Sequence, residues 1–520
     1  MTQTFSPQPQ PRLPGIGFEA VRVSNPSSLR TDVALFIGRS QRGPVGEPVR
    51  IDGMRYFQAV FGGWLADADC PLALKGFFDN GGRQAWMLRL APGATLAAGL
   101  WAVDGGGAFV PPGLALGQVR FMAASAGAWA NALSLVPTMY RTRTGLLLDI
   151  DVAQDGLLAE RLTELPLTSL DQLAQAVAER SQMVRIDPAF AAVPTASVGL
   201  GPTRQVWPAI MLTAGSNGAL AGADDYVAAL ELAAQLPEPA LLVLPDLHRD
   251  CTSAAERGEV LLAAARMADA LLDRMVIADA PRDVRDEVGL AAWMDLLQQD
   301  PAVHRTVACY HPWVQVADPL GDLRSPQRAL PPSGHVAGAI AASDLARGAH
   351  VTAANLTLAE VTDTSLRLAS DSRLPISQAG VNLLDCQSGR GLVIWGGRML
   401  RSDDVPPRFV AHRRFIHRLV RALRRSWAPQ VFEGNDDQLR YAIARQATSL
   451  LVEAFHSGVL KGNRPDEAFR VDVGDTINDA AAREAGRVYC DIAIAPAVPM
   501  EFIQIRISLS RDGTVEMVES

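Results

Sequence analysis

The sequence predicts a protein of several domains that belong to the α/β and α+β classes. With 520 residues, the chain is long enough for about three domains of ordinary size. From residue 205 onward, short apolar runs alternate with helical segments, which is typical of a parallel sheet covered by helices. Residues 501–510 instead alternate apolar and polar side chains, as expected for a strand with one buried face.

The N-terminal region is expected to begin with an extended arm over residues 1–24. Its first 14 residues contain four prolines and three glutamines, and proline removes backbone donors and favours an extended chain. Residues 25–95 then predict an N-terminal α/β part. Its strands are expected over 32–38 and 84–90, and its helices over 54–61 and 72–79.

Two further domains are expected in the middle of the chain. A stretch rich in Gly, Ala and Pro, residues 92–118, marks the start of a strand-rich inserted domain over residues 96–204. Residues 205–395 predict an α/β domain, because buried strands alternate there with helices. Its main strands are expected over 241–244, 275–278 and 303–310, and its main helices over 224–235 and 256–273.

The C-terminal region is expected to form a third unit over residues 396–500, followed by a strand or arm over 501–520. Residues 408–427 predict an amphipathic helix, because six large apolar side chains fall on one face at helical spacing. A second helix is expected to have Asn435 as its N-cap and to end at Gly458.

Composition excludes several classes of function. The net charge of −8 provides no basic footprint for general nucleic-acid binding. The five cysteines are far apart and show no ligand spacing, so neither a zinc site nor a disulfide framework is predicted, and no cofactor is expected. The N-terminus has no signal-peptide pattern and no apolar run is long enough to span a bilayer. We therefore expect a protein made in the cytoplasm, with no direct membrane insertion.

Short motifs along the chain form an ordered series from residue 14 to residue 509. The earlier motifs are Pro14–Glu19, Ala34–Gly38, Arg42–Pro44, Phe61–Gly63, Phe77–Arg83 and Gly127–Asn131. The later motifs are Tyr310–Trp313, Pro331–Gly338, Arg347–His350, Gly389–Gly391, Trp395–Arg398, Phe432–Asp436 and Ala495–Phe502. Together they resemble the motifs of contractile tail sheath proteins of phages, tailocins and related injection systems. Gly17 and Ala130 depart from the family pattern, which leaves the subfamily open.

The resemblance implies a subtilisin-like fold for the middle α/β domain. It also implies a mixed α+β domain in which the 25–95 part packs with the C-terminal domain. The implied function is structural and not enzymatic: the subunit polymerises as stacked hexameric rings around an inner tube and contracts to drive the tube through a target envelope. The implied partners are further copies of the chain, the inner tube protein, and baseplate and terminator or cap proteins. The particle would resemble a phage tail and be assembled in the cytoplasm of the producing cell.

Extended arms at both ends of the chain are implied to pair with strand-rich domains of adjacent subunits. Strand addition binds through backbone hydrogen bonds and therefore depends little on side chains. The alternative is that the same segments complete the sheet of their own subunit. The residues expected in the arms are Ile16, Phe18, Val21 and Val23 at one end and Phe502, Ile503, Ile505, Ile507 and Leu509 at the other.

The helix expected over residues 408–427 carries seven arginines and no acidic residue. A run of charge is usually a solvated face. The alternative is a contact with an acidic inner tube or a neighbouring subunit, because weak and salt-sensitive contacts add up over many copies. The candidate contact residues are Arg413, Arg414, Arg418, Arg421, Arg424 and Arg425.

Two other functions stay open. A non-contracting shell or baseplate protein could share the same fold. A degenerate serine hydrolase is suggested by Ser333 and His335 together with Asp246, Asp279 or Asp344. No Gly-x-Ser-x-Gly motif supports this function, and side chains two residues apart in a strand are at best parallel, which does not favour a Ser–His pair.

Overall fold

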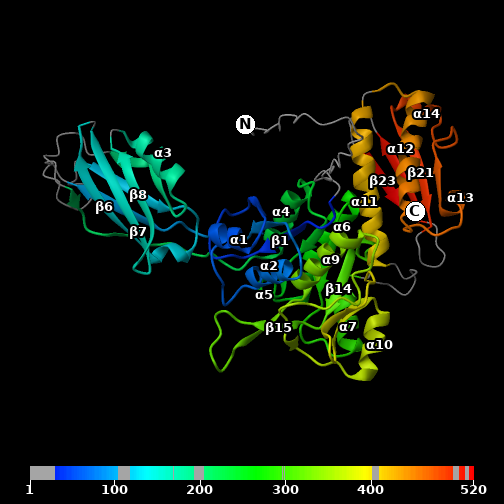
Figure 1. The fold of residues 1–520 in the computed structure, drawn as a ribbon, viewed down its shortest axis with the longest axis horizontal. Coiled ribbons are helices and arrows are strands. Elements are labelled where there is room, and N and C mark those ends of the chain that lie inside the picture. Colours follow the sequence, from blue (N-terminus) through cyan, green and yellow to red (C-terminus); the bar gives the residue numbers. More distant parts are fainter. Residues whose placement is uncertain are drawn as a thin grey trace, which may run out of the picture.

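The structure is a computed structural model of the chain. It describes residues 30–103, 117–192, 204–400, 409–495, 503–509 and 515–519, except residues 144, 168, 296, 298 and 432. Figure 1 shows a central α/β domain with a strand-rich lobe on one side and a C-terminal module on the other. The expected N-terminal arm, with Ile16, Phe18, Val21 and Val23, lies outside the described residues, as does Phe502.

The central domain is built on an eight-stranded sheet in the order β19-β18-β14-β13-β12-β1-β3-β2. Neighbouring strands from β18 to β3 are parallel, whereas the edge strands β19 and β2 run antiparallel. The strands are β1 (Ala34–Gly38), β2 (Pro48–Ile51), β3 (Ala85–Arg89), β12 (Leu241–Val243), β13 (Met275–Asp279), β14 (Val307–His311), β18 (Val381–Gln387) and β19 (Gly391–Trp395). Strands and helices alternate here as expected for an α/β domain, but the first part of the strand expected over 303–310 belongs to a helix, α8 (Pro301–Thr306).

The N-terminal part belongs to this central sheet, whereas the resemblance implied packing with the C-terminal domain. β1 lies between β12 and β3, and all five of its residues pair with β3. The physical reason is burial, because every residue of β1 is buried and such a strand needs cover on both faces. At its entry it also contacts the C-terminal module, because the carbonyl oxygens of Arg30 and Thr31 accept hydrogen bonds from Arg421 and Arg414.

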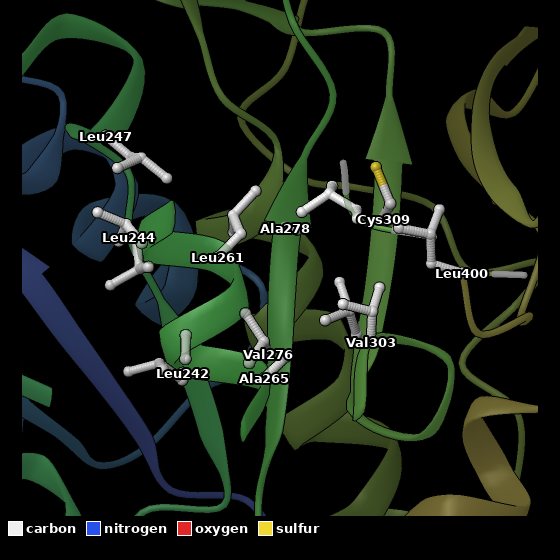
Figure 2. Packing of buried hydrophobic residues seen from close by; sticks show 14 of the residues in the cluster. Leu242, Leu244, Leu247, Leu261, Ala265, Val276, Ala278, Val303, Cys309 and Leu400 are labelled. Carbon is white, nitrogen blue, oxygen red and sulfur yellow. The ribbon is translucent and has the colours of Figure 1, made fainter. Parts of the chain in front are cut away.

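Helices cover both faces of the central sheet. Leu35 and Ile37 of β1 belong to a core that includes α4 and α6, whereas Ala34 and Phe36 belong to a second core that includes α2 and α9. Figure 2 shows the first core. The helices of the domain are α1 (Met54–Phe61), α2 (Cys70–Asp79), α4 (Ala223–Ala234), α5 (Leu247–Asp250), α6 (Ala254–Leu271), α7 (Glu287–Met294), α8, α9 (Ser333–Arg347) and α10 (Ser370–Gln378).

A small antiparallel sheet extends the central domain. It has the order β16-β15-β17, with β15 (Val314–Ala317), β16 (Gln327–Leu330) and β17 (Asp363–Thr364). The hairpin of β15 and β16 reaches away from the body of the domain in Figure 1.

The strand-rich lobe occupies the region expected for the inserted domain and contains two sheets. One sheet has the order β4-β5-β9 and the other has the order β10-β6-β7-β8, with β11 also paired to β6. The elements are β4 (Ala98–Val103), β5 (Gly117–Ala123), β6 (Leu133–Arg141), β7 (Leu146–Gln154), β8 (Leu157–Pro166), α3 (Leu170–Arg180), β9 (Val184–Ala192), β10 (Gln205–Val206) and β11 (Ile210–Met211). Because β11 is part of it, the lobe continues past the expected boundary at residue 204.

The C-terminal module packs two long helices against a four-stranded antiparallel sheet, β20-β21-β22-β23. The predicted amphipathic helix is confirmed, since Ile416, Leu419 and Leu423 enter the core of the module. The second helix is capped by Asp436, whose side chain accepts from the N–H of Leu439, and not by Asn435. The elements are α11 (Val410–Trp427), α12 (Asp437–His456), α13 (Pro465–Ala468), β20 (Phe469–Asp472), α14 (Ala480–Glu484), β21 (Val488–Ile494), β22 (Ile503–Leu509) and β23 (Val515–Glu519).

Candidate functional site

The carboxyl ends of β1 and β12 are the first candidate for a chemical site. The chain passes from β1 to β3 on one side and later enters β12 on the other, and ligands of open α/β sheets bind at such switch points. Asp246, which follows β12, is fully buried here. Its carboxylate accepts the N–H of Arg39 at 2.7 Å and that of Cys70 at 3.1 Å, and also that of Asp69.

Ion pairs fill this end of the sheet. Asp69, the N-cap residue of α2, pairs with Arg249 at 2.5 Å and with Arg328 at 2.7 Å. Asp250 pairs with Arg39 at 2.8 Å. We call these residues, together with Asp246, the edge cluster. Its contacts join the loop after β1, the start of α2, the segment after β12 and strand β16.

Burial controls the protonation of the edge cluster. It raises the pKa of Asp246 to about 7, with a further contribution from Asp250 and Asp69, although hydrogen bonds from backbone N–H groups oppose the shift. Burial also raises the pKa of Asp250 to about 6, which Arg39 and the hydroxyl of Tyr226 oppose. Because these carboxyl groups are buried and bonded within the chain, the cluster supports the fold and offers no substrate site.

Ser333 and His335 do not form a catalytic pair. They lie in the first turn of α9 and not in a strand, and helical residues two apart do not face each other. Their exposed fractions are 0% and 2%. The N–H of Ser333 donates to Asp279 at 2.8 Å, and the ring of His335 lies against Gly76 of α2. Burial lowers the pKa of His335 to about 4. The geometry therefore gives a hydrolase no support.

Arg421 of α11 is an internal hydrogen-bond donor. Its guanidinium group donates to the carbonyl oxygens of Pro239 at 2.6 Å, Glu238 at 2.9 Å and Asp273 at 3.0 Å. Burial lowers its pKa to about 10. The guanidinium group therefore binds backbone carbonyl oxygens of the central domain. The prediction that Arg421 belongs to a solvated or tube-binding face is wrong.

The same correction applies to Arg413 and Arg414. Arg414 pairs with Asp344 of α9 and donates to the carbonyl oxygen of Thr31 at 2.6 Å. Arg413 donates to the carbonyl oxygen of Arg305 at 2.6 Å and is fully buried. The apolar face of α11 packs into the core of its own module. Arginines on a second face of the helix bind the central domain.

Three arginines of α11 remain candidates for contact with a partner. Arg424 is half-buried and lies 3.5 Å from Asp273. Arg418 and Arg425 are exposed. The basic surface of the helix is therefore much smaller than its sequence suggests.

The C-terminal strand is confirmed as a strand, β22. It pairs with β21 of the same chain from Ile503, opposite Ile494, to Leu509, opposite Val488. In the single chain, β22 thus completes the sheet of its own subunit, while pairing with a neighbour stays a prediction. β20 and β23 form the two edges of this sheet in the described chain, and sheet edges can be extended by another strand.

A pocket of about 230 Å³ lies between α11, α12 and the loop that follows α9. Its apolar lining includes Leu419 of α11, Leu450 of α12 and Val459. Arg418 and Glu453, one from each helix, also line it and are exposed. We call it the α11/α12 pocket.

Neither a metal centre nor a membrane span is found in the part of the chain that the structure describes. No group of three or more His, Cys, Asp or Glu side chains there could hold a metal ion. No helix among the same residues is long and apolar enough to cross a bilayer. Cys386 is the exposed cysteine, and the other four are buried.

Residues 219–399, which include all elements from α4 to β19, match the family model of the phage tail sheath protein central domain. This stretch is thus similar to the central domain of phage tail sheath proteins, and we call it the sheath domain. No curated protein matches the chain by sequence. The sheath domain includes Asp246, Arg249, Asp250 and Arg328 of the edge cluster and the whole β15–β16 hairpin. The strands β1 to β3 and the C-terminal module lie outside the matched residues.

Solved structures extend this likeness along the chain. The crystal structure of the sheath tail protein of Listeria innocua has a TM-score of 0.65 and 13% identity, over 93% of this chain and 96% of that chain. The anti-feeding prophage (AFP) helical sheath in the contracted state has a TM-score of 0.54 and 19% identity, over 95% and 98%. The AFP baseplate structure gives 0.55 and 19%, over 96% and 98%. At these identities the likeness shows the fold alone. This fold is sheath-like within the sheath domain and also in the parts of the chain outside it.

Sequence reasoning missed the edge cluster and the α11/α12 pocket. A signal for the cluster exists, because Arg39 stands one residue, and Asp246 three residues, beyond a buried strand of the parallel sheet. Their 207-residue separation hides the contact. The pocket has no such signal, since Arg418 and Glu453 meet only through the packing of two helices.

Proposed function

We propose that this chain is the subunit of a contractile sheath, which polymerises as stacked hexameric rings around an inner tube and contracts to drive the tube through a target envelope. The observation that carries the proposal is a likeness over almost the whole chain to a helical sheath in the contracted state. A protein that had borrowed only the sheath domain would not also resemble a sheath in its lobe and its C-terminal module.

The division into a lobe, a central domain and a C-terminal module suits a subunit that must stay bound to its neighbours while the polymer contracts. The central sheet is covered on both faces, with a hydrophobic core on each face. The C-terminal module offers the edges β20 and β23, where a strand of another copy can add. We propose that the segment around Ile16–Val23, the strand Ile503–Leu509, or both make such links, because backbone hydrogen bonds survive changes in side-chain contacts.

The proposed partners are further copies of the chain, an inner tube protein, and baseplate and terminator or cap proteins. The particle would be assembled in the cytoplasm of the producing cell. Arg418 and Arg425 are the arginines of α11 that remain accessible for a tube or a neighbour. The proposal assigns the chain neither catalysis nor nucleic-acid binding.

A second candidate is a non-contracting shell or baseplate protein of the same fold. The observation that favours it is the likeness to a chain in the AFP baseplate structure, over 96% of this chain. The two candidates differ in the polymer they form, because a sheath stacks its rings into a cylinder and a baseplate component does not.

Electron microscopy of negatively stained full-length protein, expressed alone and together with its tube protein, separates these outcomes. Long, striated, hollow cylinders support the contractile sheath. Rings that do not stack, even beside the tube protein, support the second candidate. A protein that stays monomeric under both conditions overturns both.

A further inference from the structure

The hairpin between β15 and β16 ends in an exposed tip that presents Leu323 fully, and Leu320 partly, to solvent. Leu323 is 102% exposed and Leu320 is 53% exposed. Asp322 and Arg324 flank Leu323, so the tip offers an acidic, an apolar and a basic side chain in succession. A single exposed leucine is ordinary on a protein surface. Here, however, the leucine stands at the end of a projecting hairpin and between opposite charges.

The tip is held in one conformation by its own hydrogen bonds. The carboxylate of Asp318 accepts the N–H of Leu320 at 2.9 Å. The carboxylate of Asp322 accepts the N–H groups of Arg324 at 2.9 Å and Ser325 at 2.8 Å. A loop that is already ordered loses little conformational entropy when it binds. Leu323 is thus presented in a fixed position.

The α11/α12 pocket has the complementary arrangement. Leu419 and Leu450 provide apolar lining, while Arg418 from α11 and Glu453 from α12 are exposed beside it. Its volume of about 230 Å³ is sufficient for one branched aliphatic side chain. Among the described residues, no ion pair is found for the side chains of Arg418 and Glu453, or for those of the hairpin tip.

The hairpin and the pocket of one chain cannot meet. In Figure 1 the β15 hairpin projects from one side of the central domain, and α11 and α12 stand on the opposite side. A contact between them must therefore join two copies. Such a contact uses different surfaces on the two copies, so it leaves a free hairpin and a free pocket at the ends and can repeat into rings or open polymers.

We propose that Leu323 of one copy inserts into the α11/α12 pocket of a second copy, with Asp322 facing Arg418 and Arg324 facing Glu453. The occupant is a second copy because the two surfaces on this chain match in apolar character and in the order of charge. The inference rests on the proposed function, since it names one contact through which the subunits polymerise.

The first test is Leu323→Asp in the full-length protein. Burying a carboxylate in an apolar pocket is unfavourable, so we expect the concentration needed for polymerisation, measured by sedimentation, to rise about tenfold or more. Val288→Asp is the matched control, because Val288 is 78% exposed in the first turn of α7, a helix that contributes no residue to the hairpin or to the lining of the pocket. The thermal melting of the monomers should be the same for all three proteins.

A charge exchange tests the pairing itself. Arg324→Glu should weaken polymerisation, because it faces Glu453, and adding Glu453→Arg to the same chain should restore it. Arg324 is suited to this test, since only its backbone takes part in the hydrogen bonds of the tip. A double variant that polymerises no better than Arg324→Glu alone would contradict the assigned pairing.

Crosslinking then detects the contact directly. With Cys386→Ser to remove the exposed thiol, copies carrying Leu323→Cys are mixed with copies carrying Leu450→Cys and oxidised after polymerisation. We expect a covalent dimer of the two kinds of copy. If wild-type protein polymerises but no crosslink forms and Leu323→Asp has no effect, this inference fails while the proposed function stands. If wild-type protein does not polymerise alone or with its tube protein, the proposed function itself fails.

Discussion

Arg414 of α11 forms an ion pair with Asp344 of α9, and each side chain is only 3% exposed. The pair fixes the C-terminal module to the central domain, and Arg414 also donates to the carbonyl oxygen of Thr31 at the entry to β1. Three segments that are far apart in the sequence therefore converge on one guanidinium group. Burial raises the pKa of Asp344, while Arg414 opposes this shift.

Arg414→Met should destabilise the protein by about 3–5 kcal/mol, because it leaves the buried carboxylate of Asp344 without its partner. Adding Asp344→Leu should recover a large part of this loss, since a buried ion pair can often be replaced by apolar side chains at little cost. Urea denaturation followed by tryptophan fluorescence measures both variants.

Arg418→Met is the control for this prediction. Arg418 lies one turn further along the same helix but is exposed, so its replacement should change stability by no more than about 0.5 kcal/mol. Equal losses for Arg414→Met and Arg418→Met would show that helix propensity, and not the buried pair, determines the effect.

The close contact of α2 and α9 depends on small residues. A Cβ atom at Gly334 would lie 2.3 Å from the carbonyl oxygen of Ala73, which is a backbone atom that no rotamer change can move. Gly334→Ala should therefore separate the helices and cost about 1–3 kcal/mol in thermal or chemical unfolding, as overpacking does. Gly434→Ala is the matched control, because no atom lies within 4 Å of the added Cβ. Similar stabilities of the two variants would contradict the contact.

Exchange of the C-terminal strand can be tested with a cysteine that the chain already has. Cys490 of β21 is directly opposite Ile507 of β22. In Ile507→Cys with Cys386→Ser, oxidation of free subunits should join these two positions within one chain. After polymerisation, strand exchange predicts a ladder of covalently linked chains on a non-reducing gel. A single-chain product from the polymer would show that β22 stays in its own subunit. Cys386→Ser alone should give no crosslink and is the control.

The sequence predicted those parts of the fold that depend on local patterns. Residues 241–244 and 275–278 read as buried strands because they are short apolar runs, and the structure confirms β12 and β13 there. Residues 501–510 predict a strand for a different reason, the alternation of apolar and polar side chains, and the structure has β22 there. The place of β1 in the sheet could not be read in this way, because burial of Ala34–Gly38 does not say which strands lie on either side.

The arginines of α11 show the limit of a pattern of charges. Arg421 and Arg418 have the same chemistry and lie on the same helix, but Arg421 donates to four backbone carbonyl oxygens while Arg418 is exposed. The difference arises because residues 238–239 and 273 lie beside Arg421 in the folded chain. This is a tertiary contact, which cannot be read from the composition of the helix. A basic helix can therefore bind its own chain through backbone carbonyls, with few acidic partners.

We expect the free energy of unfolding to depend on pH through Asp279, which lies at the end of β13. Burial raises its pKa to about 7, although hydrogen bonds from Ser333 oppose the shift. Between the pKa of an unfolded aspartate, about 4, and this value, the folded protein binds a proton that the unfolded chain does not. The contribution is therefore fully present below about pH 4 and is lost as the pH rises through about 7. Its slope is at most about 1.4 kcal/mol per pH unit.

Asp279→Asn should remove this dependence, because an amide cannot ionise but can still accept the N–H of Ser333. The free energy of unfolding of the variant, relative to wild type, should therefore increase from pH 4 to pH 7. Burial lowers the pKa values of His248 and His335 to about 4, and they act in the opposite direction, since their stabilisation is lost on acidification. Both histidines are present in the two proteins, so the difference between the proteins isolates Asp279.

Glu433→Gln, at an exposed position, is the control and should give a curve parallel to wild type. A parallel curve for Asp279→Asn would show that this carboxyl group is already ionised in the folded protein at pH 4.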